Sequence, residues 1–274
     1  MKVIRVFPRK TNASPDDENV RFNIPMRKDE ADEIHISCSF TYDLKEAEYL
    51  YSQWKYVAPT TMGGAAITKN EGDFVSGMYL KKGYTITSRG CNNKCWFCSV
   101  WKRNEGVKEL PIVEGNIIQD DNLLACSDQH IRDVFKMLSK QKNVSFTGGI
   151  EAKLLKSWHV ELLSQLHLNN LFCAYDTPDD LEPLMNAGEL LKDANITLAN
   201  RKARCYALIG YPKDTQENAL KRLHQIIDAG FFPFAMLWRD ENGNRNHSWM
   251  KFQREWAAAP IIATHIKEYL TKLV

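Results

Sequence analysis

The chain of 274 residues has almost no net charge and no long apolar run. Its 36 Lys and Arg residues nearly balance 34 Asp and Glu residues, so composition favours neither a general nucleic-acid binder nor a site for acidic substrates. The longest apolar runs, Gly230 to Trp238 and Ala257 to Ala263, fall far short of the ~20 residues that a membrane helix needs. With 44% hydrophobic and 26% charged residues, the composition indicates a globular protein.

Neither a secretory signal nor a disulfide framework is visible. Met1 to Arg5 places charges inside a short apolar run, and no small-residue cleavage site follows it. The chain has seven cysteines, an odd number, which argues against paired structural disulfides. We therefore expect a cytoplasmic location, where thiols stay reduced.

Three cysteines stand together on one short segment. Cys91, Cys95 and Cys98 have the spacing C-x3-C-x2-C, and their thiolates could converge on one centre of the kind that iron-sulfur clusters and zinc form. A complete structural site usually has four protein ligands, so three predict an open coordination position. The alternative is a zinc site closed by His130 or another distant residue. The other cysteines lie in apolar surroundings and are expected to be buried: Cys38, Cys126, Cys173 and Cys205.

Apolar strands recur at intervals of roughly 30 residues in the second part of the chain. Between them stand helix start signals. Ser127 precedes an apolar face with helical spacing, Thr177 to Asp180 combines an N-cap with Pro and acids, and Asp214 to Glu217 resembles a capping box. Ser157 is expected to cap the helix after it. The predicted strands begin near Tyr84, Asn116, Val144, Leu171, Cys205 and Phe232.

Alternating strands and helices favour a parallel sheet, and six such units predict an α/β fold with a partial (β/α)6 TIM-like barrel over residues 81–274. In parallel barrels, chemistry gathers at the carboxyl ends of the strands. The sequence places small residues, acids and the cysteine loop there, as expected for a pocket that holds a polar ligand. In strand order these ends are Cys91 to Cys98, Gln119 to Asn122, Thr147 to Gly149, Asp176, Gly210 to Pro212, and Trp238 with Arg239.

The cysteine loop, with Arg89-Gly90 before it and an aromatic residue before its last cysteine, resembles the cluster loop of the radical S-adenosylmethionine (SAM) enzymes. In that family, three cysteines bind three irons of a [4Fe-4S] cluster and SAM chelates the fourth. The resemblance implies that Cys91, Cys95 and Cys98 are metal ligands, and that SAM is cleaved reductively to a 5'-deoxyadenosyl radical that abstracts hydrogen.

The reaction subclass stays open among oxidoreductase, transferase and isomerase chemistry. No cysteine follows Cys205 and only Cys38 precedes Cys91, so a second cluster is not expected. The resemblance implies an electron donor of flavodoxin or ferredoxin type. We expect a small molecule or a nucleotide as substrate, free or within nucleic acid. The alternative function is a non-catalytic zinc or iron-sulfur binding module.

The resemblance also implies SAM contacts on the rim. Phe97 corresponds to the aromatic residue near adenine, and Gly210 to the glycine of the fifth strand that lets the backbone approach adenine. Asp176 would bind the ribose hydroxyls or cap the following turn. The amino group has two candidate sites in the sequence: Asp120 and Asp121 after the second strand, or Gly148 and Gly149 with Glu151 after the third.

Residues 1–80 predict a small α/β unit. Ile34 to Phe40 alternates as a strand, Asp43 with Glu46 predicts the start of a helix ending near Trp54, and Thr11 to Lys28 is expected to be a loop. The unit resembles a shortened cobalamin-binding domain of part of the family. Because the Asp-x-His-x-x-Gly motif that supplies a lower axial histidine is absent, cobalamin is possible but not favoured, and a packing role is preferred.

Aromatic and basic residues alternate between Trp238 and Trp256. Such a pattern can stack bases of a nucleic acid. The favoured interpretation is that Trp249, Phe252 and Trp256 lie on one face of a closing helix that plugs the open side of the barrel.

Overall fold

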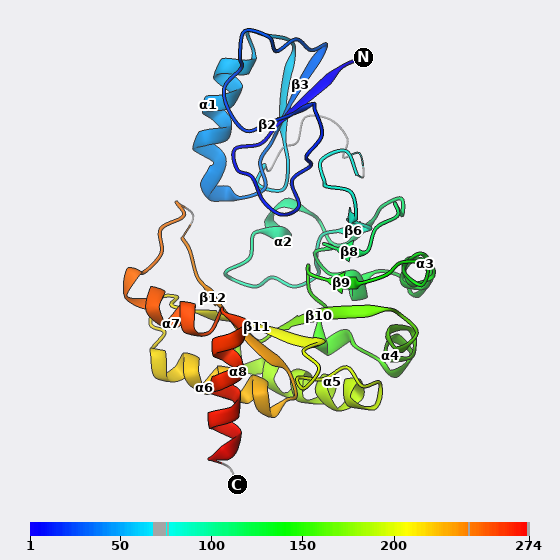
Figure 1. The fold of residues 1–274 in the computed structure, drawn as a ribbon, viewed down its shortest axis with the longest axis vertical. Coiled ribbons are helices and arrows are strands. Elements are labelled where there is room, and N and C mark those ends of the chain that lie inside the picture. Colours follow the sequence, from blue (N-terminus) through cyan, green and yellow to red (C-terminus); the bar gives the residue numbers. More distant parts are fainter. Residues whose placement is uncertain (68–74, 76, 241, 273–274) are drawn as a thin grey trace.

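The chain forms a mixed α/β fold with two parallel sheets, as the computed structural model in Figure 1 shows. The structure describes residues 1–67, 75, 77–240 and 242–272. Within these ranges neither sheet closes on itself, so the fold contains no closed barrel. The predicted α/β class is confirmed at this level. No helix in the described ranges is long and apolar enough to cross a membrane.

The N-terminal sheet consists of β1 (Val3–Val6), β2 (Val20–Arg21), β3 (Glu33–Ser37) and β4 (Thr60–Gly63). The strands lie in the order β2-β1-β3-β4, and every neighbouring pair is parallel. Helix α1 (Leu44–Trp54) joins β3 to β4 and packs beside the sheet (Figure 1). Alternate strand residues and one face of α1 form a separate core: Ile4, Val6, Ile34, Ile36, Cys38, Ala47, Leu50, Trp54 and Ala66.

Two details of this unit differ from the sequence prediction. Phe40 lies beyond the end of β3 and is 37% exposed. Asp43 precedes α1, but its side chain does not cap the helix. Its carboxylate instead accepts hydrogen bonds from Nε (2.8 Å) and Nη2 (2.7 Å) of Arg9, because a guanidinium offers a carboxylate stronger, paired hydrogen bonds than a helix amide does.

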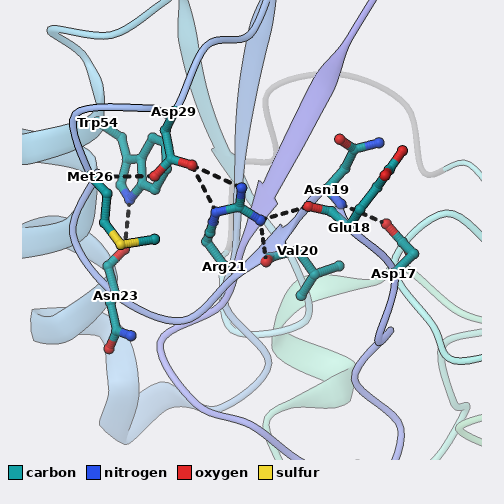
Figure 2. A network of polar contacts seen from close by, with 9 residues as sticks. All are labelled: Asp17, Glu18, Asn19, Val20, Arg21, Asn23, Met26, Asp29 and Trp54. Atoms are coloured by element: carbon teal, nitrogen blue, oxygen red, sulfur yellow. Dashed lines mark hydrogen bonds and ion pairs between the residues drawn. The ribbon is translucent and has the colours of Figure 1, made fainter.

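The segment predicted as a loop contains β2 and is held by the polar network in Figure 2. Arg21 donates from Nε (3.0 Å) and Nη2 (2.8 Å) to Asp29, which also accepts the Met26 amide (2.8 Å). Trp54 of α1 donates its indole N–H to the Asn23 carbonyl (2.9 Å). The Asp29 side chain is fully buried. These hydrogen-bond donors offset the cost of removing its negative charge from water.

The second sheet has six parallel strands in the order β12-β11-β10-β9-β8-β5. All six predicted strands are confirmed, although β5 and β8 are short. The sheet stays open between β5 and β12. The strands are β5 (Tyr84–Thr85), β8 (Ile117–Ile118), β9 (Val144–Phe146), β10 (Leu168–Ala174), β11 (Ala203–Ile209) and β12 (Phe232–Leu237).

The helices after these strands bury apolar faces against the larger core. Two start signals are confirmed, because Ser127 Oγ accepts the His130 amide (3.2 Å) and Asp180 accepts the Thr177 amide (2.8 Å). The helices are α3 (Asp128–Leu138), α4 (Ser157–Ser164), α5 (Leu181–Asp193) and α6 (Gln216–Asp228). Short 3₁₀ turns occupy Thr41–Asp43, Leu123–Ala125, Ala152–Leu154, Pro178–Asp180 and His247–Trp249.

Two other start signals were wrong in detail. Helix α6 is capped by Thr215, whose Oγ1 accepts the Asn218 amide (3.2 Å). Asp214 instead pairs with buried Arg222 (2.9 Å), which takes its carboxylate away from the helix end. Ser157 is the first residue of α4, and His159 Nδ1 accepts the Lys156 amide (3.0 Å) ahead of it.

The C-terminal segment forms α7 (Met250–Glu255) and α8 (Ala259–Thr271). The Trp256 carbonyl accepts the Ala235 amide of β12 (2.8 Å), and Tyr269 of α8 donates to Asp228 of α6 (3.0 Å). Trp249 and Trp256 are buried in the larger core. The predicted packing role is confirmed for these two tryptophans. The single closing helix is wrong, because Trp249 lies in a 3₁₀ turn and Trp256 follows the end of α7.

Candidate cluster site

The cysteine loop is closed at its base by a short antiparallel pair. Strand β6 (Ser88–Arg89) precedes the loop and pairs with β7 (Lys108–Glu109) after it. Gly90 has φ +92°, and a Cβ there would overlap the Gly106 carbonyl oxygen. Only glycine permits both this backbone conformation and this close approach. The loop also contains helix α2 (Val100–Arg103).

The three thiols of this loop lie within electrostatic reach of one another and are all partly exposed. Two of the sulfurs accept amide hydrogen bonds. Cys91 Sγ accepts from the Asn93 backbone N–H and from Asn122 Nδ2, and Cys98 Sγ accepts from the Val100 N–H, each at 3.4 Å. Amide donors of this kind stabilise a sulfur that carries negative charge.

The pKa of Cys95 is raised to about 11, chiefly by burial and in addition by the neighbouring thiols of Cys98 and Cys91. Burial also raises the pKa of Cys98, against the opposing hydrogen bond from Val100. Among the described residues, no group of three or more His, Cys, Asp or Glu side chains is arranged to hold a metal ion. His130, the residue considered for a fourth ligand, lies with Nδ1 3.8 Å from a carboxylate oxygen of Glu109.

Asp120 and Asp121 after β8 hold the backbone that leads into the loop. Asp120 is 1% exposed and accepts from Thr87 N (2.6 Å), Thr87 Oγ1 (2.6 Å) and Ser88 Oγ (2.7 Å). Burial raises its pKa, and these donors oppose the rise. Asp121 accepts the Gly90 amide (2.8 Å) and lies 3.8 Å from Arg89. Both carboxylates are thus engaged with the protein.

The ends of β8 and β9 place a second polar pair beside Cys91. Asn122 Nδ2, which donates to Cys91, also donates to Glu151 Oε2 (2.5 Å). The Asn122 Oδ1 atom is buried and has no hydrogen-bond partner among the described residues. A Cβ at Gly148 would overlap the Asp120 carbonyl oxygen, so glycine lets these two strand ends touch. Neither Asn122 nor Glu151 was assigned a contact with the cysteines from the sequence.

Asp176 joins two strands at the same edge of the sheet. Its Oδ1 accepts the Leu208 amide of β11 (2.8 Å). The turn after β10 is capped by Asp180, which accepts the Asp176 amide (3.0 Å), so the capping alternative for Asp176 was wrong. The pKa of Asp176 is raised to about 6, chiefly by burial, with Asp180 raising it and the Leu208 hydrogen bond and Arg222 opposing the rise.

Aromatic side chains connect the cysteine loop with the last two strands. The Phe97 ring meets Trp96 edge-on at 5.4 Å, and Trp96 lies 5.6 Å from Tyr211 and 6.4 Å from Trp238 between ring centroids. Gly210, with φ +71°, lies where a Cβ would come within 2.6 Å of Leu237 and 3.0 Å of Trp249. A glycine is therefore required at this position for Trp249 to pack against the backbone, independently of any contact with a ligand.

A cleft lies between the N-terminal sheet and this rim. Its large lobe, about 580 Å³, reaches from Arg9 to Gln119 and Thr147. Its small lobe, about 320 Å³, reaches Arg103 and Lys108. We call the two together the carboxyl-edge cleft. The residues that line both lobes are Ser37, Ser39, Ala65, Tyr79, Leu80, Ile86 and Arg89.

No protein-family profile matches the chain, and no curated protein matches it significantly.

Proposed function

We propose that the chain is a radical SAM enzyme and that its open six-stranded sheet is a partial (β/α)6 barrel. The observation that carries the proposal is the thiol trio of Cys91, Cys95 and Cys98 at the carboxyl end of the first strand of that sheet, with amide donors on two of the sulfurs. Catalytic sites of parallel barrels lie at this end of the strands.

The donor set is of the chemical type that an iron-sulfur cluster takes, although the described side chains are not gathered around a single metal ion. Three thiolates are ligands for such a cluster, and the amides that face Cys91 and Cys98 favour their anionic form. Since the pKa of Cys95 is about 11 without metal, metal binding would release protons from the loop. When bound, the cluster would supply the electron that cleaves SAM to a 5'-deoxyadenosyl radical for hydrogen abstraction from the substrate.

The protein's own residues would position SAM. We propose that Glu151 and the unpartnered Asn122 Oδ1 receive its amino group, because both lie beside Cys91. Asp120 and Asp121 would then act by holding the loop rather than by contacting SAM. Asp176, at the carboxyl end of β10, would accept from the ribose hydroxyls.

Adenine would lie near the ring of Phe97. Gly148 and Gly149 after β9 and Gly210 after β11 leave backbone without side chains along the same edge. An electron donor of flavodoxin or ferredoxin type would reach the partly exposed cysteine loop.

Cobalamin is not part of the proposal. Among the described residues that line the carboxyl-edge cleft, the one histidine is His35. Its Nδ1 is 2.8 Å from the Tyr79 hydroxyl and its Nε2 is 3.3 Å from Glu33. With both ring nitrogens engaged, this lining offers no axial histidine.

The test is anaerobic reconstitution with iron and sulfide, followed by SAM and dithionite. We expect about four irons per chain, a brown iron-sulfur spectrum and release of 5'-deoxyadenosine. Cys95→Ala should abolish the release, whereas Cys126→Ala, which alters a partly exposed thiol outside the trio, should retain it. A competent cluster without SAM cleavage, or a colourless protein that holds zinc, would contradict the proposal, and zinc would favour a non-catalytic metal-binding module.

A further inference from the structure

The carboxyl-edge cleft opens where the strand order of the N-terminal sheet reverses, between β1 and β3. The chain leaves β1 toward β2 on one side and leaves β3 toward β4 on the other. In open parallel sheets, ligands bind in the crevice that forms outside the carboxyl ends of strands at such a point. Phe7 and Arg9 after β1, and Ser37 and Ser39 at the end of β3, line the large lobe there.

The opposite wall of the large lobe belongs to the larger sheet. Tyr84 and Ile86 come from β5 and the residue after it, Gln119 follows β8, and Thr147 and Gly148 follow β9. These are the strand ends that border the cysteine loop. A molecule in the cleft therefore lies next to the rim on which SAM is proposed to bind.

The small lobe is rich in positive charge. Its described lining includes Arg89, Arg103 and Lys108, against Asp121 as the one carboxylate among those described residues. Asp121 already accepts the Gly90 amide. Burial lowers the pKa of Arg103, because removal from water disfavours its charged form. A bound anion would offset that cost.

The large lobe is lined by less positive charge than the small lobe. Arg9 is matched there by Asp43 through two hydrogen bonds of 2.8 and 2.7 Å. Arg89 lines this lobe as well, where it borders the small lobe. The other polar side chains of the large lobe are hydroxyls and amides, among them Ser39, Gln119 and Thr147. The cleft thus has a neutral polar end and a cationic end.

We propose that the carboxyl-edge cleft binds a small molecule whose carboxylate or phosphate is held by Arg103 and Lys108 and whose uncharged polar part lies in the large lobe. Arginine matches the geometry of these oxyanions, and lobes of 580 and 320 Å³ are of the size that small ligands occupy. The proposed anion site is independent of the proposed function. The identification of the bound molecule as the substrate rests on that function.

The test is calorimetric titration of the reconstituted protein with citrate and, separately, with inorganic phosphate. We expect at least one of them to bind, and the tighter of the two identifies the anionic group. Arg103→Gln should weaken binding about tenfold, and Lys108→Gln should weaken it as well. Lys221→Gln, which alters an exposed lysine of α6, should leave binding unchanged. If Arg103→Gln lowers the thermal midpoint of unfolding, Arg103→Lys replaces it and should lose affinity through loss of the planar fork.

A second titration in saturating SAM separates this site from the SAM site. Unchanged anion affinity is expected. Loss of anion binding on addition of SAM would overturn the proposal, because the cations would then belong to the SAM carboxylate. Absence of binding by both probes, or equal weakening by Lys221→Gln, would overturn it too. Anion binding without SAM cleavage would leave the anion site standing and remove the proposed function.

Discussion

Acidic side chains near the cysteine loop accept more hydrogen bonds from the protein than their position in the sequence suggests. Asp120 accepts three hydrogen bonds from Thr87 and Ser88, and these two residues lie just before the loop. A buried carboxylate with this many donors fixes the backbone around it. At the residue scale, the placement of the thiols therefore depends on a side chain that bears no sulfur.

Removal of this carboxylate should destabilise the protein. Asp120→Ala leaves three buried donors without an acceptor, at a cost of about 1–3 kcal/mol for each donor that water cannot reach. Urea unfolding followed by circular dichroism measures the loss. Asp179→Ala, at an exposed position, is the matched control and should change stability little. Equal stability of the two variants would show that Asp120 does not hold the loop.

Asp176 should make stability depend on pH. Because its pKa in the folded protein is about 6 against an ordinary value of 3.8, its protonated form favours folding. That contribution is present below pH ~4 and is lost as the pH rises through 6, by roughly 3 kcal/mol. Asp176→Asn, which keeps an acceptor for the Leu208 amide, should therefore gain stability relative to wild type between pH 4 and pH 6. Parallel pH profiles of the two proteins would contradict the assignment.

The strands of the larger sheet and the helices after them were predictable because each follows from a local sequence pattern. Each of its strands is a short apolar run with a helix after it, and that period is visible in the residues alone. The capping roles of the Asp43 and Asp214 side chains were predicted wrongly for the opposite reason. The Asp43 carboxylate binds Arg9, which is far away in the sequence, and the Asp214 carboxylate binds Arg222, which is buried in the fold. No rule based on neighbouring residues anticipates such partners.

Helix α5 packs closely against the end of α6 at Gly188. Gly188 lies inside α5, where alanine would favour the helix by about 1 kcal/mol. A Cβ there would overlap the Ala229 carbonyl oxygen at the end of α6, and overpacking of this kind costs about 1–3 kcal/mol. Gly188→Ala should thus destabilise the protein, whereas Glu189→Ala on the exposed side of the same helix should not. A rise in thermal midpoint for Gly188→Ala would refute the close contact.

At the scale of the whole molecule, the carboxyl-edge cleft is the feature that sequence patterns could not give. Its walls come from segments as far apart as Arg9 and Thr147, and they meet only because two sheets with separate cores lie side by side (Figure 1). The three cysteines were visible in the sequence because they are close along the chain. Glu151 was visible only as one of two alternatives, since its distance from Cys91 depends on how β8 and β9 pair.

We propose that three thiols of this chain hold a cluster with one iron left for SAM. Electron paramagnetic resonance of the dithionite-reduced protein, recorded with and without SAM, tests it most directly. We expect a reduced [4Fe-4S] signal whose shape changes when SAM is added and which is absent in Cys95→Ala. A reduced protein without a cluster signal, or a signal that SAM leaves unchanged, would contradict it.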